Sequence, residues 1–183
     1  MKIYLVRHAQ RGRGKDYDAL NPLGLKQAKR LGPYFKNKKI DIVYCSENER
    51  AIQTLKYIKP FLKKNVKIII TKEIRQHNVP EEVGKDAIKE FDLKIESETE
   101  LKKRVKNFFN FLKKNHKNNS VLIVSHKEVI KSLICHIFNR PFLESIFIDK
   151  LPSASISYFE FDNNFKLKYS IVGDLAHLMK KLK

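Results

Sequence analysis

Two histidines and two arginines follow apolar runs in the sequence, and their types suit phosphate chemistry. Arg7 and His8 come after IYLV, Arg50 lies in CSENER after DIVY, and His126 follows VLIVS. A guanidinium fork matches the oxygens of a phosphate. A neutral imidazole can attack phosphorus, and a second, protonated imidazole can stabilise the oxygens. If these side chains meet, they form a site for phosphoryl transfer that requires no metal.

Alternating strand and helix patterns would bring these side chains together. Short apolar runs predict strands at residues 3–6, 40–44, 66–70, 121–124, 156–161 and 167–172. The first four runs are nearly continuous, as in a parallel sheet that is buried on both faces. Because the carboxyl ends of parallel strands share one edge of a sheet, we expect His8, Arg50 and His126 to lie close together there.

Helical patterns separate the predicted strands, and three of them have recognisable starts. Asn21 precedes a proline, and both Ser46–Glu49 and Ser97–Glu100 have the form of a capping box. A fourth helix follows His126. The alternation predicts one domain over residues 1–183, an α/β protein built as a three-layer α/β/α sandwich around a mostly parallel sheet of about six strands. Residues 73–96 are the least regular and are expected to form an excursion on the substrate side.

The composition limits the class of protein. The formal net charge is +18, which would suit nucleic acid, but most of the basic residues are lysines spread over polar segments. We therefore expect solvated lysine faces and no nucleic-acid partner. Cys45 and Cys135 lack metal-site spacing and are expected to be core thiols in a reducing compartment. No leader peptide or membrane span is evident, which predicts a cytoplasmic protein without membrane contact.

Six segments resemble one known family in order and spacing: LVRHAQ, LNPLGLKQA, YCSENERAIQT, VSHKEVI, PSASIS and VGDLAHL. They are similar to the histidine phosphatase superfamily, also called the phosphoglycerate mutase-like family, over essentially the whole chain. The resemblance implies that His8 is a nucleophile that becomes a phosphohistidine. It implies that Arg7 and Arg50 bind phosphate, and that His126 is the second histidine of the phosphate pocket.

The resemblance also implies a carboxyl group that protonates the leaving group. Glu73, in TKEIRQ, best matches its position, and Glu81 and Glu82 are rivals. An acid in this role must be desolvated to stay protonated near neutral pH.

The sequence departs from the family pattern at three positions beside the pocket. Ala9 replaces a glycine, Gly14 stands where many members that act on sugar phosphates have an asparagine, and Lys127 replaces another glycine. Lys127 either adds charge to the pocket or points to solvent. The candidates for substrate contacts are Arg11, Arg13, Arg75 and Lys127. The histidines expected to be structural or on the surface are His77, His116, His136 and His177.

We therefore expect a metal-independent phosphatase, without a cofactor, that works through a phosphohistidine on His8. Its substrate would be a phosphorylated small molecule or a phosphoprotein. One alternative is a phosphoglycerate mutase-like phosphotransferase. Another is a non-catalytic module that binds phosphate or nucleic acid, which the departures from the family pattern keep open. The sequence leaves the oligomeric state open.

Overall fold

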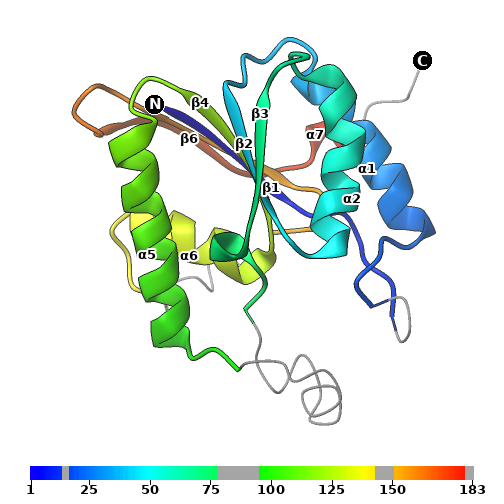
Figure 1. Cartoon of the computed structure of the whole chain (residues 1–183), viewed down its shortest axis with the longest axis horizontal. Helices are drawn as coiled ribbons and strands as arrows, with labels where there is room; N and C mark the ends of the chain where they lie inside the picture. Colours follow the sequence, from blue (N-terminus) through cyan, green and yellow to red (C-terminus); the bar gives the residue numbers. More distant parts are fainter. Residues whose placement is uncertain (14–16, 78–94, 143–150, 180–183) are drawn as a thin grey trace.

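A six-stranded sheet in the order β3-β2-β4-β1-β5-β6 forms the centre of the molecule (Figure 1). The computed structural model describes residues 1–13, 17–77, 95–142 and 151–179. The strands are β1 (Lys2–Arg7), β2 (Ile42–Ser46), β3 (Lys67–Thr71), β4 (Ser120–Ser125), β5 (Ile156–Phe161) and β6 (Leu167–Asp174). The first four in chain order run parallel, and β5 and β6 are antiparallel to their neighbours. The expected mostly parallel sheet is confirmed.

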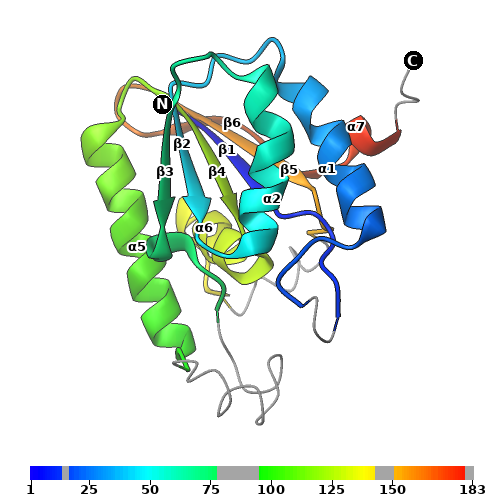
Figure 2. The same ribbon diagram turned by 45° about the vertical axis from the view of Figure 1, so that its right-hand side comes forward.

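Helices cover both faces of the sheet, which confirms the three-layer arrangement (Figure 2). One layer contains α1 (Pro22–Phe35), α2 (Glu49–Ile58) and the short α7 (Ala176–Met179), and the other contains α5 (Glu98–Asn115) and α6 (Lys127–Ile137). Two short 3₁₀ turns, η2 (Lys59–Phe61) and η3 (Lys72–Ile74), follow α2 and β3. No helix in the described part of the chain is long and apolar enough to cross a membrane.

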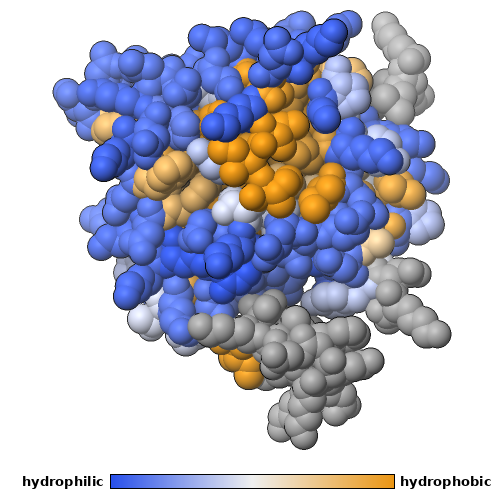
Figure 3. Space-filling model, viewed as in Figure 1, coloured by the Kyte–Doolittle hydropathy of each residue, from blue (hydrophilic) through white to orange (hydrophobic). Residues whose placement is uncertain are grey.

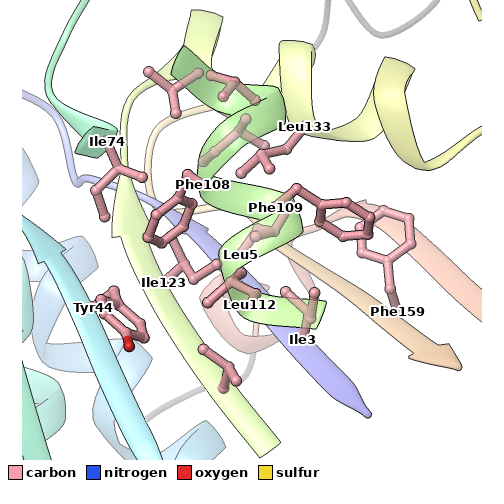
Figure 4. Close-up of a cluster of buried hydrophobic side chains, with 14 of the residues drawn as sticks. Ile3, Leu5, Tyr44, Ile74, Phe108, Phe109, Leu112, Ile123, Leu133 and Phe159 are labelled. Carbon is pink, nitrogen blue, oxygen red and sulfur yellow. The ribbon is translucent and has the colours of Figure 1, made fainter. Parts of the chain in front are cut away.

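The sheet separates two hydrophobic clusters, one under each helical layer. In the cluster under α5 and α6, Leu5 and Ile123 from the sheet lie beside Phe108, Leu112 and Leu133 from the helices (Figure 4). The continuous apolar sequences of β1 and β4 follow from this arrangement, because each of these central strands is covered on both faces. Truncating Leu112, which is fully buried, to alanine would cost about 2–5 kcal/mol.

Two of the three expected helix starts are confirmed. Asn21 accepts a hydrogen bond from the Gly24 backbone N–H at 2.7 Å ahead of α1. At the start of α5, Ser97 and Glu100 form a reciprocal capping box. The third expectation was wrong. Because Ser46 is the last residue of β2, α2 begins three residues later, after Asn48, and the Ser46 hydroxyl is free for another role.

The excursion expected at residues 73–96 is described only at its two ends. Its first residues form part of η3 and continue to His77, and its last residues lead from Ile95 into α5. Glu81 and Glu82, the rival proton donors, lie outside the described residues, as does Gly14.

Candidate active site

The carboxyl ends of the parallel strands bring His8, Arg50 and His126 together. His8 follows β1, Arg50 lies in the first turn of α2, and His126 is the residue that caps α6 after β4. Strands β1 and β4 are paired in register up to their last residues. The two imidazole ring centroids lie 5.1 Å apart. Residues more than a hundred positions apart in the sequence therefore share one site.

The His8 ring is oriented by the backbone of the next residue. Its Nδ1 lies 2.7 Å from the Ala9 carbonyl oxygen. Because a carbonyl oxygen only accepts hydrogen bonds, Nδ1 carries the proton, and in the neutral ring Nε2 holds the lone pair. Burial lowers the pKa of His8 well below its usual value, and the charge of nearby Arg50 adds to this effect. His8 is therefore a neutral imidazole with Nε2 as its nucleophilic atom.

The His126 ring is oriented by hydrogen bonds at both nitrogens. Arg50 Nη2 lies 3.2 Å from Nδ1. Because a guanidinium only donates, Nδ1 is the acceptor and Nε2 carries the proton. Nε2–H then donates to the Ser46 hydroxyl at 2.7 Å, and that hydroxyl donates to Asn48 Oδ1 at 3.1 Å. Burial, followed by the proximity of His8 and Arg50, lowers the pKa of His126 well below its usual value, so this ring is also neutral in the free site.

Arg50 is almost completely enclosed, with 1% of its surface exposed. Its guanidinium donates hydrogen bonds to Asp18 and Gln76 as well as to His126. Its Nε is buried and has no hydrogen-bond partner among the described residues. A cation in the first turn of a helix opposes the helix dipole. The helix dipole therefore does not stabilise Arg50, and its hydrogen bonds to side chains from other segments hold it in place.

The cavity beside these residues has a volume of about 380 Å³. This volume suits a small molecule. The residues that line it are Arg7, His8, Arg11, Gln76, His77, His126, Lys127 and Glu128. Arg7 is half-buried, and its Nη1 donates to the Leu151 carbonyl. The lining is strongly cationic and includes the N-terminal end of α6, where backbone N–H groups favour an anion.

The candidates for substrate contacts fall into two groups. Arg11 and Lys127 line the cavity, and the Arg11 guanidinium lies 3.7 Å from the centre of the Tyr17 ring. Arg13 is exposed and does not line the cavity. Arg75 does not line it either, and it pairs with Glu96 at 3.5 Å. Of the two alternatives for Lys127, its place on the cavity wall favours added charge.

The carboxylates are arranged differently from what the sequence alone would suggest. Glu73 is half-buried in η3, its carbonyl oxygen accepts a hydrogen bond from Arg104 at 2.8 Å, and it is not among the cavity-lining residues. Glu128, in the first turn of α6, is the carboxylate that lines the cavity. Its two oxygens lie 4.0 Å from the ammonium groups of Lys127 and Lys131.

The structure adds site residues that sequence patterns did not identify. His77 lines the cavity, with Nε2 2.8 Å from the Glu96 carbonyl oxygen, although a structural or surface role was expected. Ser46, Asp18 and Gln76 position the catalytic candidates. No local sequence signal distinguishes these three residues from ordinary loop and strand-end residues. In the described ranges, no group of three or more His, Cys, Asp or Glu side chains is placed to hold a metal ion.

Comparison with known proteins gives a family match over most of the chain. The model of the histidine phosphatase superfamily (branch 1) matches residues 3–168. A relative from Hydrogenobacter thermophilus that carries the name "Putative phosphoserine phosphatase 2" is 31% identical, and the match covers 73% of this chain and 77% of the relative.

Solved structures of other proteins have the same fold. YhfR of Bacillus stearothermophilus aligns with a TM-score of 0.78 at 20% identity, over 97% of this chain and 98% of that one. The H9A mutant of a phosphoserine phosphatase from Entamoeba histolytica, in complex with phosphoserine, aligns with a TM-score of 0.69 at 21% identity, over 97% and 99% of the two chains. At these identities, the structural likeness concerns the fold.

Proposed function

Because the chain belongs to the histidine phosphatase superfamily, we propose that it is a metal-independent phosphatase that hydrolyses phosphomonoesters through a phosphohistidine on His8. The family match and the named relative support phosphatase activity. The observation that carries the finer proposal is the orientation of His8. Its Nδ1 is held by the Ala9 carbonyl, which leaves Nε2 as the nucleophile beside His126 and Arg50.

In the first step, His8 Nε2 attacks the phosphorus atom and the bond from phosphorus to the ester oxygen breaks. Arg7, Arg50 and the N-terminal end of α6 stabilise the three phosphoryl oxygens, where negative charge is concentrated in the transition state. His126, which is hydrogen-bonded to Arg50, completes the phosphate pocket. Protonation of His126 adds a proton at Nδ1, which accepts from Arg50 in the free site, so the Arg50 guanidinium must turn from Nδ1 to the phosphate for the ring to become charged. A phosphate dianion beside the ring opposes the burial and positive charges that keep it neutral, and so favours the protonated form.

The departing ester oxygen requires a proton, which we assign to a carboxylic acid. The family resemblance points to Glu73, and the lining of the cavity makes Glu128 a second candidate. In the second step, the same group, now ionised, takes a proton from water. That water attacks phosphorus, the bond from phosphorus to Nε2 breaks, and phosphate leaves.

The cavity favours a small phosphoester with an additional negative group. Arg11 and Lys127 add positive charge to the lining beyond the phosphate pocket itself. Phosphoserine carries a carboxylate and occurs in the name of the relative, so it is the first substrate to test. We include phosphoproteins among the proposed substrates, and we propose no nucleic-acid partner. A cytoplasmic location is also part of the proposal, because Cys45 and Cys135 are buried and form no disulfide bond.

The test is a phosphate-release assay with an aryl phosphate, phosphoserine, phosphorylated metabolites and phosphopeptides. His8→Ala should abolish turnover. The matched control His116→Ala should retain turnover, because His116 does not line the cavity and its ring is hydrogen-bonded to the Tyr44 hydroxyl. Vanadate should inhibit and a chelator should have no effect. Turnover retained by the His8 variant, or lost on chelation, would refute the proposed mechanism.

One observation keeps a non-catalytic phosphate-binding role as the second candidate. Glu73, the acid that the family resemblance implies, does not line the cavity. Phosphate binding without release from any ester in the panel would favour this second role. Transfer of phosphate between positions of one substrate would instead favour a mutase.

A further inference from the structure

A second cavity lies at the opposite end of the central strands from the active site. Its volume is about 480 Å³, which is in the range of small-molecule sites. Lys2, the first residue of β1, lines this cavity, whereas His8 of the active site follows the last residue of β1. The extended strand between them spans roughly 20 Å. Within the described ranges the two cavities have no lining residue in common, so they are separate.

Tyrosine side chains form the floor of this second cavity, which we call the tyrosine cavity. Tyr4 in β1 is paired with Tyr158 in β5, and residues paired across a sheet point to the same face. Their ring centroids lie 4.8 Å apart, and the Tyr169 ring in β6 lies 6.0 Å from that of Tyr158. Tyr34, from the last turn of α1, lines the cavity as well. Three strands and one helix thus place aromatic rings around one hollow.

Tyr4 is a buried hydrogen-bond donor that lacks a protein partner. It is 7% exposed, and no described residue forms a hydrogen bond with its hydroxyl, which is open to the cavity. Burial raises the pKa of Tyr4 to about 12, so the hydroxyl keeps its proton at neutral pH. Because buried hydroxyls are nearly always hydrogen-bonded, this donor points to a ligand that supplies an acceptor.

Three lysines form the rim of the tyrosine cavity: Lys2, Lys38 and Lys39. The carboxylates nearest to two of them are Glu160, 4.0 Å from Lys2, and Asp41, 3.7 Å from Lys39. Neither carboxylate lines the cavity. Ion pairs of this exposed kind are weak, so both ammonium groups can turn toward a bound anion. Lys38 has no carboxylate within ion-pair distance in the described part of the chain.

Positive charge alone would not identify a site on this protein. Hydrophilic residues cover most of the face shown in Figure 3, and the formal net charge is +18. The tyrosine cavity differs because aromatic faces and ammonium groups meet in one hollow, where Tyr169 is 53% exposed. Aromatic rings stack on flat heterocycles, and ammonium groups bind phosphate, so the combination suits a nucleotide.

We propose that the tyrosine cavity is a second ligand site, which binds a nucleoside monophosphate with its base on the tyrosine rings and its phosphate at the lysine rim. The Tyr4 hydroxyl donates a hydrogen bond to this ligand from the floor. A single nucleotide suits a hollow of this volume. A nucleic-acid strand would instead need a groove with successive stacking platforms.

Nuclear magnetic resonance of the full chain, labelled with nitrogen-15, locates the site directly. The probe is the phosphonate analogue of AMP, in which a methylene group replaces the ester oxygen, so phosphatase activity cannot consume it. The amide resonances of Lys38, Tyr158 and Tyr169 should shift and saturate, with a dissociation constant of about 10 μM to 1 mM. Shifts confined to His8 and Lys127 in the active site, or no shifts up to about 5 mM, would overturn the proposal.

Charge reversal at the rim tests the phosphate contact by isothermal titration calorimetry. Lys38→Glu should raise the dissociation constant of the analogue by at least about tenfold, because a charge-assisted contact is lost. The matched control is Lys36→Glu, which changes the net charge equally at an exposed residue that does not line the cavity. It should stay within about twofold of the unmodified chain, because salt screens distant charges. Equal effects of the two variants would mean that binding follows net charge and not the cavity.

Substitutions of Tyr169 test the contact with the base. Tyr169→Ser should raise the dissociation constant of the analogue by at least about fivefold, the lower limit for one stacking contact. Tyr169→Phe keeps the ring and should bind like the unmodified chain. Unchanged binding in Tyr169→Ser would contradict stacking on this ring. Tighter binding of a short single-stranded oligonucleotide than of the analogue would identify a nucleic-acid surface and refute a single-nucleotide site.

Discussion

At the scale of single residues, the orientation of His126 depends on Ser46. The Ser46 hydroxyl oxygen accepts a hydrogen bond from His126 Nε2–H, and Arg50 donates a hydrogen bond to the other ring nitrogen, Nδ1. Ser46→Ala would leave a buried N–H without a partner, at a cost of about 1–3 kcal/mol. We predict a fall in kcat of roughly 10-fold to 100-fold for an aryl phosphate.

The effect on pH dependence would separate positioning of the ring from a general loss of structure. Ser46→Thr keeps the hydroxyl and should recover most of the activity. Ser46→Ala should also shift the pH profile of kcat, because the hydroxyl interacts with a titrating ring. If Ser46→Ala and Ser46→Thr lost activity equally with an unchanged pH profile, the Ser46 hydroxyl would not be orienting His126.

The identity of the proton donor can be resolved by comparing Glu73→Gln with Glu128→Gln. Removing the true donor should lower kcat by about 10²-fold to 10⁴-fold for an alkyl phosphate, whose leaving group needs a proton. The same variant should affect p-nitrophenyl phosphate far less, because that leaving group departs readily as an anion. Equal, small effects of both variants on both substrates would point to a donor outside these two residues.

Residue types and order were enough to predict that His8, Arg50 and His126 share one site, because strand ends in a parallel sheet have fixed positions. The supporting contacts could not be predicted. Ser46 matched a capping box, and nothing in the local pattern shows that the strand extends to include it. The partners of Arg50 come from distant segments, and their pairing arises only in the folded chain.

At the scale of elements, α1 packs tightly against the loop that follows His8. A Cβ added at Gly24 would lie 1.9 Å from the carbonyl oxygen of Gln10, two residues after His8. The loop backbone would have to move. Gly24→Ala should therefore destabilise the fold by about 1–3 kcal/mol from overpacking, which outweighs the gain of about 1 kcal/mol in helix propensity.

Displacement of this loop should also lower kcat, since the loop carries the Ala9 carbonyl that orients His8. Urea denaturation and the aryl phosphate assay measure the two effects. Leu23→Ala is the control on the same helix, because Leu23 is 52% exposed. Wild-type stability and activity in Gly24→Ala would mean that the close approach of α1 to the loop is unimportant.

Element types were more predictable than the ends of elements. All six expected strands occur, with shifts of a few residues at their ends. The helix starts at Asn21 and Ser97 were predicted correctly because each carries its own local hydrogen bonds. The start of α2 was misplaced because Ser46 belongs to β2, so that the helix begins only after Asn48. Short α7 has too few residues to give a helical period.

At the scale of the whole molecule, the two buried histidines link stability to pH. Both have a pKa below the usual 6.5, and burial is the main cause. Below pH 6.5 the unfolded chain therefore binds more protons than the folded chain. The free energy of unfolding should fall as the pH falls, by up to about 1.4 kcal/mol per pH unit for each ring.

Urea denaturation at about pH 7.5, 6.5 and 5.5 measures this slope. The double variant His8→Gln/His126→Gln should lose stability less steeply over the same interval, whatever its stability at pH 7.5. Its other histidines are unchanged, so the comparison isolates the two rings. Identical slopes for the two proteins would show that the pKa values of these rings do not differ between the folded and unfolded states.

The most direct test of the phosphohistidine mechanism is to find where phosphate resides on the protein during turnover. Rapid quenching under neutral to alkaline conditions, followed by phosphorus NMR and peptide mass spectrometry, identifies the modified atom. We predict a phosphoryl group on Nε2 of His8, because Nδ1 is held by the Ala9 carbonyl, and no phosphoprotein from His8→Ala. Phosphate on Nδ1, on His126 or on no residue of an actively turning-over enzyme would contradict this mechanism.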